Sequence, residues 1–261
     1  MAASWKPMLV TAAVVSLVLV VDDGTTARSG AVADPTQPAR SPAPTTTGPT
    51  LDPTATALPH RDKSGVIQTT GAPGKTVALT FDDGPSLEHT PQVLDILDIH
   101  DVDATFCVVG RKVQEHPGLV KEIADRGHAL CDHTNTHDLH LGHRTEDQIR
   151  TEIGRTADEI RAAAPDAKVP FYRAPGGNFS AEVIAVAASY DQQPLGWSVD
   201  PRDWTEPGAN AIVTTVLDQV VPGSVVLLHD GGGDQSETVD ALDQIITELE
   251  AAGYTFVIPT I

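Results

Sequence analysis

The chain has 261 residues, enough for one substantial domain with additional segments. A formal net charge of −19 argues against nucleic acid as a partner and against electrostatic adhesion to anionic membranes. Since 40% of the residues are hydrophobic, the chain can build a core and is not disordered throughout.

The N-terminus, residues 1–33, is typical of a signal peptide. An apolar run at 8–21 is too short for a membrane-spanning helix, Lys6 precedes it, and Ala-Val-Ala at 31–33 is a cleavage site with small residues. Two aspartates at 22 and 23 are unusual before such a site, so a retained anchor is the alternative. We expect an exported protein, secreted or associated with the cell wall. After cleavage it should be monomeric and not inserted in a membrane.

Residues 34–72 are rich in Pro, Thr and Ala and contain almost no large apolar side chains, so they cannot bury enough surface to fold. This composition predicts a linker before a folded catalytic domain at 73–261.

From residue 74 onward, short apolar strands alternate with segments of helical periodicity. We expect strands at 75–81, 102–109, 128–131, 169–172, 194–199, 224–228 and 254–258. We expect helices that begin at 90 and 117, a helix with a capping box at 145–165, and helices near 181–189, 211–220 and 239–251. Repeated β-then-α units imply an α/β fold with a parallel sheet. Polar motifs end nearly every strand, which favours a closed or nearly closed barrel with those ends on one face.

Two adjacent carboxylates, Asp82 and Asp83, end the first of these strands within Thr80-Phe-Asp-Asp-Gly84. Because side chains alternate along a strand, the two should not easily point at the same atom. That geometry suits a division of labour in which one carboxylate binds a ligand and the other handles a proton. An acidic turn without function is the alternative.

A histidine pair, His133 and His137, follows the third strand. Histidines four apart on a helical turn face the same side and can share one ion, and Asp83 would add a carboxylate ligand. A divalent ion held in this way lowers the pKa of a bound water toward about 7. Because His140 and His143 lie nearby, a generic polar loop is the alternative.

Later strands end in further polar groups. Arg173 could pair with Asp82, although a surface arginine before a turn is the alternative. At Gly176 a backbone N–H could face an oxyanion. His229 follows an apolar strand, which suits a general acid if a carboxylate orients it. Leu227 and Trp204 would provide an apolar pocket.

Together these stretches resemble the polysaccharide deacetylase family, the carbohydrate esterases that share the nodulation deacetylase homology domain. The resemblance covers roughly residues 73–261 and rests on five ordered motifs: TFDDG at 80–84, HTxxH at 133–137, RxPG at 173–176, DxxDW at 200–204 and LxH at 227–229. It implies a distorted, possibly incomplete (β/α) barrel and metal-dependent deacetylation of an acylated sugar polymer.

The resemblance also implies roles for single residues. Asp82 is similar to the catalytic base, and Arg173 to the arginine that pairs with it. Asp83, His133 and His137 are similar to the ligands of a divalent metal ion, most often Zn²⁺.

Further matches concern the acid and the substrate. His229 resembles the general acid, and Asp203 the carboxylate that orients it. Leu227 and Trp204 resemble the walls of the acetyl pocket, and Gly176 the backbone N–H donor to the oxyanion. The third motif often ends in tyrosine, so Gly176 removes a side-chain wall of the groove.

We therefore expect a metal-dependent N-deacetylase of N-acetylglucosamine-type residues in peptidoglycan or a chitin-like polymer, with acetylxylan esterase as the alternative. The two cysteines, Cys107 and Cys131, lie near the ends of consecutive strands. Consecutive parallel strands are usually neighbours, which predicts a disulfide in an exported protein. Two buried free thiols are the alternative.

Overall fold

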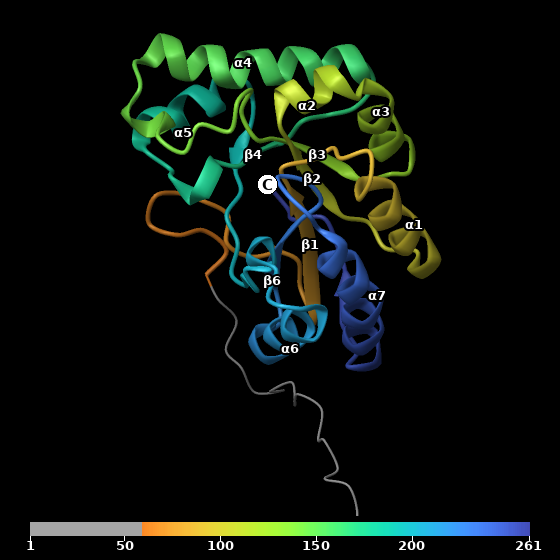
Figure 1. Ribbon diagram of the computed structural model, residues 1–261. Coiled ribbons are helices and arrows are strands. Elements are labelled where there is room, and N and C mark those ends of the chain that lie inside the picture. Colours follow the sequence, from red (N-terminus) through yellow and green to blue (C-terminus); the bar gives the residue numbers. More distant parts are fainter. Residues whose placement is uncertain (1–58) are drawn as a thin grey trace, which may run out of the picture. The chain divides into compact units, whose positions relative to one another are not determined.

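The structure, a computed structural model, describes residues 59–261 (Figure 1). The strands are β1 (Thr76–Asp82), β2 (Thr105–Val108), β3 (Ala129–Asp132), β4 (Phe171–Tyr172), β5 (Gln193–Pro194), β6 (Ser224–His229) and β7 (Thr255–Phe256). The α-helices are α1 (Thr90–His100), α2 (Gly110–Glu115), α3 (Pro117–Asp125), α4 (Glu146–Ala163), α5 (Ala181–Ala188), α6 (Ala209–Gln219) and α7 (Ser236–Ala251). Short 3₁₀ helices are η1 (Leu141–His143), η2 (Pro175–Gly177) and η3 (Asp203–Thr205).

The strands form one parallel sheet in the order β5-β4-β3-β2-β1-β6, and β7 pairs with the start of β1. The predicted strand at 194–199 is wrong in extent, because only Gln193 and Pro194 form β5. The chain beyond β5 instead approaches β6 through a single bridge between Val199 and Val226. The sheet is therefore a curled, incompletely closed (β/α) barrel, as the sequence predicts.

Because side chains alternate along β1, one set of its residues packs in the apolar core and the other set faces the candidate site. Val77, Leu79 and Phe81 belong to the large apolar cluster that includes the packed faces of α1, α6 and α7. Residues of the opposite parity, Thr80 and Asp82, therefore face the interior of the barrel. An inward-facing aspartate at the carboxyl end of the central strand is thus a direct result of the strand period.

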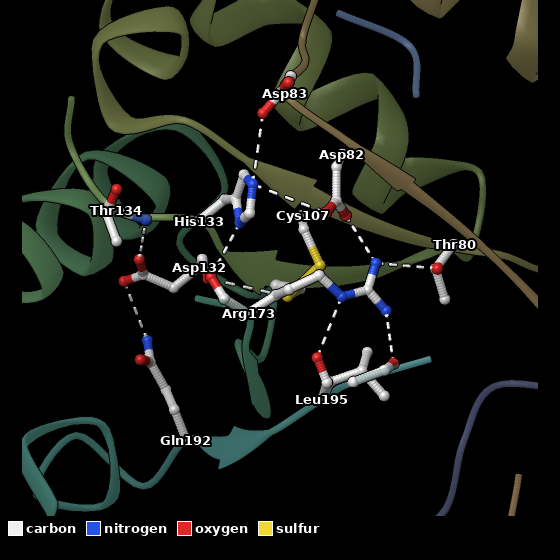
Figure 2. The surroundings of a disulfide bond; sticks show 12 residues. Thr80, Asp82, Asp83, Cys107, Asp132, His133, Thr134, Arg173, Gln192 and Leu195 are labelled. Atoms are coloured by element: carbon white, nitrogen blue, oxygen red, sulfur yellow. Dashed lines mark hydrogen bonds and ion pairs between the residues drawn. A yellow bond between two sulfur atoms is a disulfide. The ribbon is translucent and has the colours of Figure 1, made fainter. Parts of the chain in front are cut away.

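The disulfide predicted between Cys107 and Cys131 is present (Figure 2). The two residues are register partners on β2 and β3, and both are fully buried. Asp82 is the register partner of Cys107 on the other side of β2. The covalent link therefore joins β2 to β3 close to the polar end of the barrel.

The folded part of the chain begins before residue 73. Val66 and Ile67 are buried, and Ile67 bridges Leu195 and packs with Phe171 inside the barrel. The segment at 59–72, which the composition assigns to the linker, is therefore part of the folded domain. The Pro- and Thr-rich composition of the whole predicted linker, 34–72, obscures the short apolar pair near its end.

The structure confirms some of the other predicted helix and strand features and corrects others. The capping box at the start of α4 is present: Thr145 Oγ1 accepts the N–H of Gln148, whose side chain accepts the N–H of Thr145. Helix α2 has no counterpart among the predicted elements, and the strand predicted at 102–109 is shorter, Thr105–Val108. Within residues 59–261, no helix is long and apolar enough to cross a membrane.

Candidate active site

A buried ion pair joins the end of β1 to the end of β4. The guanidinium of Arg173 donates from Nη1 to Asp82 Oδ1 at 2.6 Å and to Thr80 Oγ1 at 2.9 Å. Its Nε and Nη2 donate to the carbonyl oxygens of Leu195 and Gly196, each at 3.0 Å. Since Arg173 is 0% exposed, these four acceptors satisfy a fully buried cation. The pairing of Arg173 with Asp82 that the sequence predicts is present.

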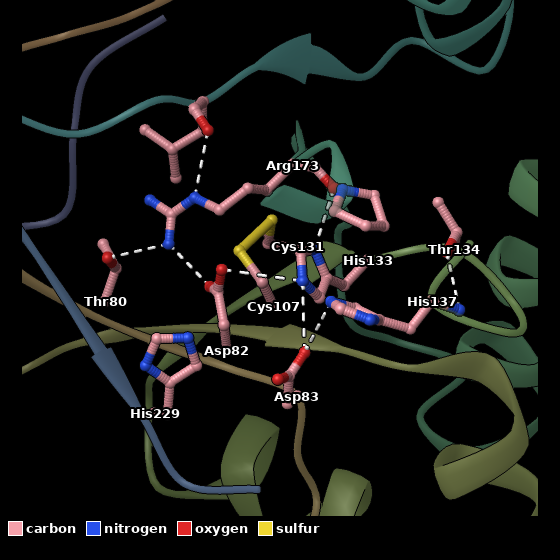
Figure 3. A network of polar contacts seen from close by, with 12 residues as sticks. Thr80, Asp82, Asp83, Cys107, Cys131, His133, Thr134, His137, Arg173 and His229 are labelled. Atoms are coloured by element: carbon pink, nitrogen blue, oxygen red, sulfur yellow. Dashed lines mark hydrogen bonds and ion pairs between the residues drawn. A yellow bond between two sulfur atoms is a disulfide. The ribbon is translucent and has the colours of Figure 1, made fainter. Parts of the chain in front are cut away.

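The imidazole of His133 lies between the two adjacent carboxylates (Figure 3). Its Nδ1 lies 2.8 Å from the carbonyl oxygen of Arg173, which can only accept, so Nδ1 carries the hydrogen. Its Nε2 lies 3.6 Å from Asp82 Oδ2 and 3.3 Å from Asp83 Oδ1. In the neutral imidazole, the lone pair of this nitrogen therefore faces the site.

The expectation that Asp82 and Asp83 point at different atoms is wrong, since both lie near His133 Nε2. Strand β1 ends at Asp82, and Asp83 has a φ of 71°. This left-handed conformation breaks the strand alternation and turns the second carboxylate toward the same imidazole.

The expected helical turn at 133–137 is also wrong. Both histidines lie in the irregular loop after β3, where Thr134 and His137 have φ values of 65° and 56°. Within this loop, Thr134 Oγ1 accepts the N–H of His137 at 3.1 Å. The imidazole Nε2 of His137 lies 3.1 Å from Asp83 Oδ1. The two histidines therefore converge on Asp83 as the sequence predicts, but through a loop instead of a helical turn.

These three side chains have the donor set of a metal site. Asp83 Oδ1 and the two imidazole nitrogens lie within 4.8 Å of one another. Oδ1 is buried and has no hydrogen-bond partner. Burial opposes ionisation of Asp83, but His133 and then His137 lower its pKa to about 2. Two neutral imidazoles and one carboxylate fit a divalent ion such as Zn²⁺.

A second acid–base pair lies across the pocket. Asp203 Oδ1 lies 2.8 Å from His229 Nδ1, and Asp203 Oδ2 accepts the N–H of His229 at 2.7 Å and the hydroxyl of Thr238 at 2.9 Å. The ring nitrogen Nε2 of His229 is left for the pocket. Burial disfavours the charged imidazole, but Asp203 outweighs it and raises the pKa of His229 to about 9.

A pocket of about 410 Å³ is lined by one member of each pair, Asp82 and His229, and by the three converging side chains. Gly176, Trp204 and Leu227 line it as well, so the predicted wall residues do meet at this site. Leu227 is buried and Trp204 is 52% exposed, which places one at the floor and the other at the rim. Most of the expected residues thus line a single cavity, while Arg173 and Asp203 lie behind it and contact Asp82 and His229.

Two buried carboxyl groups beside the motifs escape the sequence reasoning. Asp132 precedes His133, accepts the N–H of Thr134 at 2.8 Å, and has its pKa raised to about 8 by burial. Asp230 follows His229, accepts a hydrogen bond from the hydroxyl of Thr90, and has its pKa raised to about 7, mainly by burial. Their only signal in the sequence is their position next to a motif histidine.

Comparisons with known proteins agree with this geometry. A family model described as polysaccharide deacetylase matches residues 69–195. A chitooligosaccharide deacetylase of Sinorhizobium fredii is 42% identical over 197 residues, which are 71% of this chain and 89% of that protein. The chain belongs to the polysaccharide deacetylase family. Another family member, a peptidoglycan-N-acetylglucosamine deacetylase of Bacillus cereus, is 40% identical over 186 residues, covering 70% of this chain and 85% of the relative.

A solved structure extends the comparison within the polysaccharide deacetylase family. A mutant of a CE4 family pseudoenzyme, one with restored enzymatic activity, superposes with a TM-score of 0.68 at 34% identity. The match covers 73% of this chain and 68% of that one. Since this fold occurs in a pseudoenzyme, activity has to be argued from the site residues.

Proposed function

We propose that the protein is an exported, zinc-dependent hydrolase that removes acetyl groups from N-acetylglucosamine-type residues of peptidoglycan or a chitin-like polymer. The observation that carries this proposal is the convergence of Asp83, His133 and His137 in one pocket with Asp82 and His229. The names of the two relatives, which act on chitooligosaccharide and on peptidoglycan N-acetylglucosamine, support the substrate class.

Export also belongs to this proposal. The signal peptide at 1–33 and most of the linker lie outside the described residues. A buried disulfide supports an oxidising compartment, since such bonds form and persist there. We expect the mature protein to act as a monomer outside the cell or in the wall.

Asp82 acts as the base. Its Oδ1 is occupied by Arg173, and its Oδ2 faces the ligand side chains, where it accepts a proton from the attacking water. Asp83, His133 and His137 would hold the ion, which supplies Lewis acidity and lowers the pKa of water toward about 7. The chain's own contribution at this point is to orient the acceptor oxygen.

His229 acts as the acid. Asp203 fixes the imidazole so that Nε2 faces the pocket, and it keeps the ring protonated near neutral pH. The departing amine nitrogen receives this proton. Gly176 provides a backbone N–H for the oxyanion, while Leu227 and Trp204 enclose the acetyl methyl group.

Acetate release tests the proposal. The purified full chain, loaded with Zn²⁺, is incubated with N-acetylchitooligosaccharides, peptidoglycan and acetylxylan. Acetate and new free amines are expected from the first two substrates. Asp82→Asn is the matched control, because it keeps the ligand set and should bind metal without turnover. Release from acetylxylan alone would identify an O-deacetylase and refute the proposed substrate class.

A further inference from the structure

Three glycines follow Asp230 at the end of β6, and the first two lie directly against Asp83. We call Gly231–Gly233 the glycine strap. A Cβ placed on Gly232 would lie 2.5 Å from Asp83 Oδ2 and 3.1 Å from its Cγ. A Cβ on Gly231 would overlap the carbonyl oxygen of Asp83 and lie 2.8 Å from the amide nitrogen of Gly84. Only residues without a side chain allow this approach.

Asp83 needs such a support because its own segment does not hold it. Strand β1 has ended, and the left-handed φ of 71° at a non-glycine residue is unfavourable. Its Oδ1 has no hydrogen-bond partner, while the two imidazole nitrogens 3.1 and 3.3 Å away are the atoms that it must meet. The other carboxylate oxygen, Oδ2, lies in the space that a Cβ on Gly232 would need.

The strap is anchored at its start. The N–H of Asp230 donates to the carbonyl oxygen of Asp82 at 3.1 Å, and the carboxylate of Asp230 packs against Gly84 and accepts the hydroxyl of Thr90. These contacts flank Asp83 on both sides in the sequence. The backbone of the strap therefore cannot move away from Asp83 without breaking them.

We propose that Gly231 and Gly232 are positioning residues, whose bare backbone presses on Asp83 and directs Oδ1 toward His133 and His137. The inference rests on the proposed metal site. Because only Asp230 separates the strap from His229, one short segment carries the proposed acid and orients a proposed metal ligand. A side chain at Gly232 should displace the carboxylate of Asp83, weaken metal binding and leave the His229–Asp203 pair in place.

Zinc affinity of the metal-free full chain tests this, measured by competition with a chromophoric chelator. Gly232→Ala should bind Zn²⁺ about 10- to 100-fold more weakly than wild type, the usual cost of disturbing the support of a ligand. Gly233→Ala is the local control, since the nearest atom to its Cβ would be 3.9 Å away, and it should bind like wild type.

The backbone cost of a side chain at positive φ needs its own control. Gly253 has a φ of 81°, against 80° at Gly232, and a Cβ there would meet nothing within 4 Å. Gly253→Ala should lower the thermal midpoint as an alanine at such a φ does, but keep wild-type zinc affinity. If Gly232→Ala fails to fold, Gly232→Asn replaces it, because asparagine tolerates the left-handed region and still adds the Cβ.

The outcomes are separable. Wild-type affinity in a folded Gly232 variant would overturn the positioning role, as would an equal loss in Gly233→Ala. Wild-type protein that binds no divalent ion would refute the metal site itself, and with it the proposed function. A selective loss at Gly232 supports the strap.

Discussion

Two buried carboxylates lie at the same pocket, Asp82 directly and Asp203 through His229, and each is paired with a basic side chain. Asp82 is paired with the fully buried guanidinium of Arg173, and arginine is a permanent cation as a residue type. Asp203 is paired with His229, which can gain and lose a proton. The first pair fixes a charge, whereas the second can deliver a proton.

The surroundings of the two pairs follow the same division. Every nitrogen of the Arg173 side chain donates to a protein acceptor, and the side chain is fully buried, so it does not reach a substrate. His229 uses Nδ1 for Asp203 and leaves Nε2 for the pocket. A permanent partner suits Asp82, the proposed base, which has to stay in place, and a titratable partner suits His229, the proposed acid.

The largest effect on activity is expected when His229, the titratable partner, is replaced. His229→Ala should lower kcat/KM on an N-acetylated sugar by on the order of 10²–10⁴, because an amine cannot leave without a proton. The same variant should lose much less on an activated aryl acetate ester, whose leaving group needs no acid. Steady-state kinetics with both substrates measure the difference. Equal losses would show that His229 positions the substrate instead of donating a proton.

Replacement of Arg173, the partner with the fixed charge, should mainly lower the free energy of unfolding. Arg173→Leu leaves Asp82 buried without a partner and should cost about 3–5 kcal/mol in the free energy of unfolding. The double variant Asp82→Asn/Arg173→Leu no longer contains the unpaired charge and should recover part of that loss. Urea unfolding measures both. A double variant less stable than the single one would contradict the charge argument.

The disulfide should stabilise the part of the sheet beside the Asp82–Arg173 pair, and not the part beside the Asp203–His229 pair. It links β2 and β3, and its loop spans a sequence separation of 24. Reduction should lower the free energy of unfolding by about 3 kcal/mol, by the chain-entropy estimate. Denaturant curves with and without reductant test this, with intact mass to verify the redox state. Unchanged stability after complete reduction would exclude a contribution from the bond.

The smallest expected effect is a shift in the pH dependence of activity. His229 binds its proton more tightly in the folded protein, so activity that needs this proton should fall as the pH rises through about 9. The stability that the proton contributes is complete below about pH 6.5 and is lost across the same rise. Asp203→Asn removes the main raising influence and should move the basic limb of kcat/KM toward about 6.5. A limb that stays in place would assign it to another group.

Most of the site could be predicted because it depends on strand ends. Parallel strands deliver their carboxyl ends to one face, so motifs far apart in the sequence, at Asp82, Arg173 and His229, had to converge. The capping box of α4 is a local signal, and it was also correct. Both kinds of inference use regular geometry.

The errors occur where the backbone leaves regular geometry. Asp83 and His137 have positive φ values, which neither strand nor helix periodicity describes. The spacing of His133 and His137 fits a helical turn, yet a loop brings them together instead. The strap contacts could be suspected only from three consecutive glycines, and the buried acid Asp230 only from its neighbour.

Ile67 packs inside the barrel, although it precedes residue 69, where the match to the family model starts. The same segment meets the other end of the chain, since the N–H of Thr260 donates to the carbonyl oxygen of Thr70 at 2.8 Å. The position of a protease cut therefore matters. A cut between Ile67 and Thr76 would separate Ile67 from the rest of the chain and expose its packing partner Phe171 to water.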